Sequence, residues 1–223
     1  MKTKVKTEET RMLILDTALG LFQKNGFEKT TMREIASAAG VALGAAYYYY
    51  DSKDAMVMAF YERAQREMEA EIRNSLTSST SLEKRLQRLI EVKFKYFQPN
   101  RLLLGALSAH TDPEHPLSPF SQQTREIREQ DIRFFNEAIE GSRHRVTSDL
   151  KVYLPRLLWM YQMGLILHWV YDRSKGQRST QVLFEKSLSI MVALIRLASF
   201  PLLKPVRRMI VDLLETVYGE DEQ

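Results

Sequence analysis

The sequence has no cysteine, and its 223 residues include only seven prolines and nine glycines. Without cysteine, disulfides, thiol nucleophiles and cysteine-based zinc sites are excluded. So few prolines and glycines are not typical of a disordered chain or of a sheet-rich fold with many tight turns. No apolar run approaches the ~18 residues of a membrane span, and the charged residues 1–11 do not resemble a secretory signal. We therefore expect a cytoplasmic globular protein with no membrane partner.

Basic residues exceed acidic residues by four, which permits a polyanionic partner without proving one. The excess does not lie in the N-terminal region, because residues 1–60 contain eight basic and seven acidic residues, a net charge of +1. Residues 61–214 contribute +7, and the last nine residues contribute −4. Lys2, Lys4 and Lys6 precede the first acidic residue, and this tail either lies along phosphates or is a plain solvated terminus.

Apolar residues recur every three or four positions through most of the chain, which is the spacing of amphipathic helices. No segment alternates apolar and polar residues as a strand does, and there is no internal repeat. Prolines at positions 113, 116 and 119 predict a loop. The pattern predicts an all-α fold whose helices cover 10–24, 31–39, 43–49, 53 into the seventies, 82–97, 119–139, 148–173, 179–199 and 205–218.

Two short helices close together in the sequence carry the functional signal. Thr31 followed three residues later by Glu34 is the pattern of a capping box and predicts a helix start. Gly40 ends this helix, and a second helix over 43–49 begins two or three residues later. Such a pair is the helix-turn-helix arrangement, in which the second helix enters the major groove of DNA. Ala36 is small enough to let the two helices meet closely.

Around these helices the sequence resembles the TetR/AcrR family of bacterial transcriptional regulators. The residues that agree in type and spacing are Gly26-Phe27, Thr30-Thr31-Met32-Arg33-Glu34-Ile35-Ala36, Ala39-Gly40-Val41, Gly44 and Tyr47-Tyr48-Tyr49-Tyr50-Asp51-Ser52-Lys53. The resemblance implies a homodimeric repressor that binds a double-stranded DNA operator and is released by a small, mostly apolar effector. It also implies a three-helix helix-turn-helix domain at residues 1–55 and a helical bundle at 56–223 for ligand sensing and dimerisation.

Carried over to this chain, the resemblance implies eight DNA-binding residues, namely Thr31, Arg33, Leu43, Gly44, Ala45, Tyr48, Tyr49 and Lys53. Lys53 would bind a phosphate at a helix start, and Tyr48 and Tyr49 would contact the DNA backbone. We expect the neighbouring Tyr47 and Tyr50 to pack inward as structural aromatics.

The second helix of the motif departs from the family pattern in two ways. Ala42 stands where the family usually has Ser or Thr, so this helix lacks a side-chain cap worth ~1 kcal/mol. The helix also offers no arginine, asparagine or glutamine to read base edges. Base recognition then rests on Arg33 in the first helix, on apolar contact with thymine methyl groups, or on DNA shape.

The C-terminal region contains two strongly apolar helices, which the resemblance makes the dimerisation pair. The predicted helix over 179–199 has an apolar stripe at helical spacing, made of Phe184, Leu188, Met191, Val192 and Ile195. Such a stripe forms either the dimer interface or the core of one chain, and we assign this one to the interface. The predicted effector pocket consists of aromatic and soft side chains on the middle helices: Tyr96, Phe97, Leu104, Phe134, Trp159, Met163, His168 and Trp169. Each of these can equally be an ordinary core residue.

One cluster contains residue types that bind metals, namely His110, Asp112, Glu114 and His115. It lies in the proline-rich loop with no helical geometry to hold it, so we predict neither a metal nor a cofactor. The sequence has no Ser-His-Asp arrangement and no Gly-rich phosphate signature, which argues against an enzyme. The remaining alternatives are a helical protein-binding adaptor that has lost DNA binding and an activator with the same DNA-binding fold.

Overall fold

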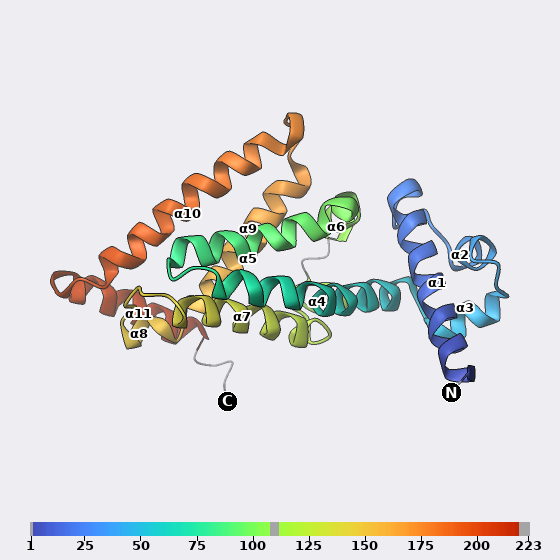
Figure 1. The fold of residues 1–223 in the computed structure, drawn as a ribbon, viewed down its shortest axis with the longest axis horizontal. Coiled ribbons are helices and arrows are strands. Elements are labelled where there is room, and N and C mark those ends of the chain that lie inside the picture. Colours follow the sequence, from blue (N-terminus) through green and yellow to red (C-terminus); the bar gives the residue numbers. More distant parts are fainter. Residues whose placement is uncertain (1, 108–111, 219–223) are drawn as a thin grey trace. The chain divides into compact units, whose positions relative to one another are not determined.

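A computed structural model of the chain describes residues 2–107 and 112–218. All regular elements among these residues are helices, as the periodicity predicts (Figure 1). The α-helices are α1 (Lys2–Asn25), α2 (Met32–Ala38), α3 (Leu43–Tyr49), α4 (Lys53–Thr77), α5 (Leu82–Phe97), α6 (Arg101–Leu107), α7 (Arg125–Glu140), α8 (Ser148–Lys151), α9 (Leu154–Tyr171), α10 (Arg178–Ala198) and α11 (Lys204–Tyr218). Short 3-10 helices cover Gln98–Asn100, Lys175–Gln177 and Pro201–Leu203.

Packing divides the chain into two compact units. The first unit contains the chain up to Met68 together with Tyr96–Arg128. The second unit contains Glu69–Lys95 together with the chain from Glu129 onward, so α4, α5 and α7 each contribute to both units. The predicted DNA-binding region lies entirely within the first unit, and its predicted end at residue 55 remains a prediction.

The first unit is built on the apolar face of α1. Ile14, Ala18 and Phe22 of this helix are buried in one core with Ile35 of α2 and Phe60 of α4. Full burial of a large apolar side chain contributes ~1.5–3 kcal/mol. This core holds α1, α2 and α4 together, and α3 packs against α2.

The second unit is a helical bundle with a buried arginine at the ends of two of its helices. Arg85 of α5 donates hydrogen bonds to four main-chain carbonyls, those of Leu76, Ser79, Glu137 and Ala138. These carbonyls lie at or just beyond the C-terminal ends of α4 and α7, which leave carbonyls unpaired and carry partial negative charge. A β-carbon at Gly141 would overlap the guanidinium, so the glycine after α7 leaves room for it.

Two helix starts differ from the prediction. α1 begins at Lys2 rather than near residue 10, so the basic tail is part of a helix. α7 begins at Arg125 rather than near residue 119. The hydroxyl groups of Ser121 and Thr124 bond to main-chain groups just before it, and such local bonds compete with a helix.

The predicted helix over 148–173 is two helices, α8 and α9. Pro155 lies in the first turn of α9, where its missing N–H is tolerated but a preceding helix cannot continue through it. No single helix among the described residues is long and apolar enough to cross a membrane. The pair Lys175–Ala198 and Pro201–Val217, bent by 87°, passes that test only when taken together.

Candidate nucleic-acid interface

Helix α2 begins with the capping box that the sequence predicts. The Thr31 hydroxyl accepts a hydrogen bond from the Glu34 main-chain N–H at 3.2 Å, and the Glu34 carboxylate accepts one from the Thr31 main-chain N–H at 2.8 Å. The Thr31 hydroxyl also donates to this carboxylate at 2.8 Å. The hydrogen bond from the Thr31 main-chain N–H contributes most to holding the pKa of Glu34 below its ordinary value, and the bond from the Thr31 hydroxyl contributes next. Thr31 is exposed, as its predicted DNA contact requires, but its hydroxyl is already engaged in this cap.

Gly40 makes the turn between α2 and α3. Its φ of +68° lies in the left-handed region, where a residue with a β-carbon is strained. The Gly40 N–H bonds to the Ser37 carbonyl at 3.2 Å, and the Val41 N–H bonds to the Ala36 carbonyl at 3.0 Å. These bonds close the turn and bring α3 against α2, as the helix-turn-helix prediction requires.

Helix α3 has one buried side and one exposed side. Ala46 is fully buried, and Tyr50 directly after the helix is 4% exposed. The Tyr50 hydroxyl donates to the Arg11 carbonyl of α1 at 3.2 Å, which fixes the end of α3 to α1. Ala45, one of the predicted DNA-binding residues, is half-buried. The exposed side, which we call the α3 face, consists of Leu43, Gly44, Tyr47 and Tyr48.

The four consecutive tyrosines are placed only partly as predicted. Tyr50 packs inward as predicted, but Tyr47 is 49% exposed, so the expectation that it packs inward is wrong. Tyr48 is 79% exposed, whereas Tyr49 is half-buried against the core of the first unit, with its ring edge-on to Tyr48 at 5.2 Å. The signal that could have identified Tyr47 is its spacing of four residues from Leu43, which places both side chains on one helix face.

The two cations of the predicted site have different surroundings. The Lys53 ammonium donates to the main-chain carbonyls of Phe27 at 2.7 Å and Glu28 at 3.4 Å, and it lies 4.5 Å from the centre of the Phe27 ring. The phosphate contact predicted for Lys53 would therefore require it to share or leave these carbonyls. Arg33 on α2 is exposed and has no hydrogen-bond or ion-pair partner among the residues that the structure describes.

The eight residues predicted for the effector pocket are divided between the two units. Tyr96, Phe97 and Leu104 belong to the first unit, where the rings of Tyr96 and Phe97 meet edge-on at 5.3 Å. The Tyr96 hydroxyl donates a hydrogen bond to the Glu67 carboxylate at 2.5 Å. Burial, and to a smaller extent this hydrogen bond, raise the pKa of Tyr96 to about 12. The second unit contains the other five: Phe134, Trp159, Met163, His168 and Trp169.

Within the second unit, most of these predicted pocket residues are packed into the bundle. Phe134 and Trp159 are buried, and Trp169 stacks on Phe94 at 5.0 Å. His168 is exposed, and Met163 is half-buried. An open groove of about 520 Å³ in this unit is lined by other residues, namely Glu71, Asn74, Ser75, Ser78, Arg88, Glu91, Val92 and Lys95. The predicted pocket therefore stays a prediction.

The apolar stripe assigned to the dimer interface lies inside a single chain. Phe184, Leu188, Val192 and Ile195 of α10 have exposures between 1% and 7%, and Met191 is half-buried. Four of the five side chains have almost no surface left for a second copy, so assigning this stripe to the interface is wrong and the alternative, a core within one chain, applies. The large apolar residues that α10 leaves exposed lie away from this stripe: Val182, Leu183, Ile190, Leu194 and Leu197.

The possible metal cluster lies partly outside the described residues, because it includes His110. Asp112 accepts a hydrogen bond from the Glu114 main-chain N–H at 3.0 Å, and His115 Nδ1 accepts one from the Leu117 N–H at 3.2 Å. No group of three or more possible metal-ligating side chains occurs in the part of the chain that the structure describes.

Two short helices joined by the glycine turn, with an exposed face on the second, together with a separate helical bundle, define a helix-turn-helix regulator. Comparison with known families gives the same result. Residues 14–60 match the model for bacterial regulatory proteins of the tetR family, and residues 85–214 match the tetracycline repressor-like C-terminal domain. The chain belongs to the TetR family of bacterial transcriptional regulators.

Similarity to individual relatives covers only a short part of the chain. The regulator AcrR of Shigella flexneri is 44% identical over 61 residues, which are 27% of this chain and 28% of AcrR. The regulator TtgR of Pseudomonas putida is 38% identical over 61 residues, which are 27% of this chain and 29% of TtgR. The matched segment thus spans less than a third of each relative.

Solved structures share the fold across most of the chain. A TetR regulator from Haloarcula marismortui has a TM-score of 0.66 at 19% identity, covering 84% of this chain and 98% of its own. The regulator FadR from Bacillus subtilis, solved with stearoyl-CoA, has a TM-score of 0.60 at 16% identity, covering 81% of this chain and 97% of its own. At these identities the likeness concerns the fold alone.

Proposed function

We propose that the protein is a cytoplasmic, homodimeric DNA-binding transcriptional repressor that a small, mostly apolar effector releases from its operator. The observation that carries this proposal is the α3 face, which the Gly40 turn and the Tyr50 bond to α1 hold on a rigid helical support. In a helix-turn-helix protein the second helix enters the major groove and the first crosses the DNA backbone. The proposal assigns no enzymatic step to the chain.

The exposed polar groups around α3 suit contacts with phosphates. Tyr48 offers a hydroxyl at the outer edge of the α3 face, and Arg33 on the first helix of the motif is an exposed cation. Side chains of these types are common donors to phosphate oxygens, and such contacts position a protein on DNA without reading sequence. We assign Tyr48 and Arg33 to this positioning role.

Exposed apolar stripes on α9 and α10 support a dimer. The α9 stripe consists of Met160, Gly164, Leu167 and Tyr171, and the α10 stripe consists of Leu183, Ile190, Leu194 and Leu197. Both helices belong to the second unit and pack against each other. Exposed apolar side chains gathered on neighbouring helices are typical of a protein interface. To bind two successive major grooves, the two α3 helices of such a dimer would have to lie about 34 Å apart.

The aromatic interior of the second unit supports an effector with a large apolar part. Trp169 stacks on Phe94, whose ring also meets Phe184 at 6.0 Å. FadR of Bacillus subtilis shares the fold and was solved with stearoyl-CoA, a molecule with a long acyl chain. An effector that binds one of two conformations more tightly shifts the protein toward it, and DNA affinity changes by the same coupling energy.

The decisive experiment is selection of bound sequences from a random DNA library with the purified chain. We expect an inverted repeat, bound with an affinity that falls steeply as salt rises. Arg33→Ala should weaken binding to all sequences alike and reduce the salt slope by about one. Arg133→Ala, which removes another exposed arginine, on α7, is the matched control and should leave binding unchanged. Failure to select any sequence would overturn the proposal.

A further inference from the structure

The α3 face contains no side chain of the kinds that read bases by paired hydrogen bonds. Arginine, lysine, asparagine and glutamine make such contacts in the major groove. The α3 face offers instead Leu43, which is 36% exposed, the bare main chain of Gly44, and the rings of Tyr47 and Tyr48. Whatever sequence this face distinguishes, it distinguishes mainly with apolar surface.

Arg33 does not replace the missing base readers. It lies on α2, the first helix of the motif, and this helix crosses the DNA backbone rather than entering the groove. Lys53 is also engaged, because its ammonium bonds to the Phe27 carbonyl. The nearest cations are therefore placed for phosphates or for the protein itself.

Only one group on the floor of the major groove matches an apolar side chain, and it is the 5-methyl group of thymine. Leu43 and Tyr47 are four residues apart, so they lie side by side on the part of α3 that would meet base edges. Gly44 next to them has no side chain, and a β-carbon there would point into open space, so DNA can approach the helix closely.

We propose that the protein recognises its operator through thymine 5-methyl groups, which contact Leu43 and the Tyr47 ring on the α3 face. This inference rests on the proposed DNA-binding function and specifies the chemistry of the operator. Each half-site would then contain thymines at the positions under α3, and recognition would depend on their methyl groups rather than on their hydrogen-bonding edges.

The test is a thymine-to-uracil scan of the selected operator. Uracil keeps every hydrogen-bonding group of thymine and lacks only the methyl, so the substitution isolates the proposed contact. We expect uracil at the contacted positions to weaken binding about fourfold per methyl group. Uracil outside the half-sites should have no effect. If no position in the half-sites responds to uracil, the inference is wrong and recognition belongs to Arg33 or to DNA shape.

Variants assign the contact to the side chains. Leu43→Ala should lose the preference for thymine over uracil at the position that Leu43 contacts and keep it at the position under Tyr47, whereas Tyr47→Phe, which keeps the ring, should retain the preference at both positions. Leu202→Ala, which shortens another exposed leucine, is the matched control and should behave as the wild type. A full thymine preference in a folded Leu43→Ala variant would contradict the assignment. The scan on the wild type needs no variant, and a protein that selects no DNA at all would overturn the proposed function instead.

Discussion

Lys93, Asp131 and Gln162 form a polar cluster inside the second unit. The Lys93 ammonium lies 2.6 Å from Asp131 Oδ2, and the Gln162 amide donates to the same oxygen at 3.3 Å. Lys93 and Gln162 are 2% and 1% exposed, and Asp131 is 8% exposed. Burial lowers the pKa of Lys93, and the neighbouring Asp131 charge opposes this effect. Each charge in this cluster therefore depends on the other for compensation.

Removing one partner of this buried pair should be costly. Asp131→Ala leaves the Lys93 ammonium buried without its carboxylate, and we expect the free energy of unfolding to fall by ~3–5 kcal/mol. Replacing both residues, as Lys93→Met with Asp131→Leu, should recover most of the loss because no buried charge remains. Denaturant unfolding of the three proteins measures both effects. Equal loss in the single and double variants would contradict this account.

At the scale of single elements, α3 is the helix whose start is least supported. Ala42 already has the extended backbone of an N-cap residue, with φ of −64° and ψ of 147°, but its side chain cannot accept a hydrogen bond. Ala42→Ser should therefore stabilise the protein by ~1 kcal/mol. Thr31→Ala, which removes the corresponding cap of α2, should destabilise it by a similar amount. Thermal unfolding checks both, and a loss of stability in Ala42→Ser would count against the predicted cap.

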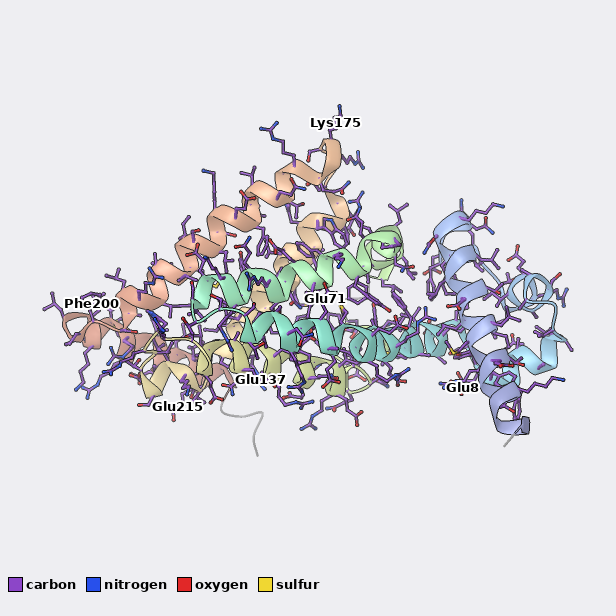
Figure 2. The ribbon with its side chains drawn as sticks, viewed as in Figure 1. Glu8, Glu71, Glu137, Lys175, Phe200 and Glu215 are labelled. Atoms are coloured by element: carbon purple, nitrogen blue, oxygen red, sulfur yellow. The ribbon has the colours of Figure 1, made fainter. Side chains whose placement is uncertain are left out.

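A buried arginine joins helix α11 to α8 and to the end of α10. Arg207 Nε donates to Asp149 Oδ2 of α8 at 2.8 Å, and its other nitrogen donates to the Ala198 carbonyl at the end of α10 at 2.9 Å. Figure 2 shows Phe200 at the turn between α10 and α11, at the opposite end of α10 from Lys175. The nearby Thr147 hydroxyl and the hydrogen bond from Arg207 lower the pKa of Asp149 to about 2. The attachment of α11 therefore depends on an ionised carboxylate.

This attachment should be sensitive to acid. Because the pKa of Asp149 in the folded protein lies below its unfolded value, the stabilisation is complete above that unfolded value of 3.8 and is lost as pH falls toward about 2. We expect the wild type to melt at a higher temperature than Asp149→Asn at pH 6. This difference should shrink steadily between about pH 4 and about pH 2.5. A difference that stays constant with pH would show that Asp149 does not act through its charge.

At the scale of the whole molecule, the exposed α9 and α10 stripes should govern assembly. Ile190 is 61% exposed in the single chain, so a charge there costs the monomer little but would be buried in the proposed dimer. Ile190→Glu should therefore yield folded monomer in sedimentation experiments, in which we expect the wild type to sediment as a dimer. Leu102→Glu, at a 68% exposed leucine of α6, is the control and should remain dimeric. A dimeric Ile190→Glu variant would place the interface elsewhere.

Local sequence signals were sufficient for the helix-turn-helix part of the fold. The capping box of Thr31 and Glu34 and the stop at Gly40 depend on neighbours in the chain, so they are confirmed where predicted. Periodicity missed the break before α9, which is due to Pro155 in its first turn. It also missed the late start of α7, because side-chain hydrogen bonds to the main chain before that helix compete with helix formation. The family resemblance added the expectation of a dimer and an effector, which no local pattern contains.

The sequence by itself determined an all-helical chain, the motif that presents α3, and the absence of base-reading side chains on that helix. Only the tertiary structure decided which face of each helix is buried. α10 is apolar on both sides, with Leu188 buried and Ile190 exposed, so periodicity cannot choose its inner face. Packing against α9 makes that choice. Tertiary packing likewise separates exposed Tyr47 from buried Tyr50, because the burial of Tyr50 depends on its contact with α1. Contacts between residues far apart in sequence depend on the free energy of the whole fold, so no local sequence pattern predicts them.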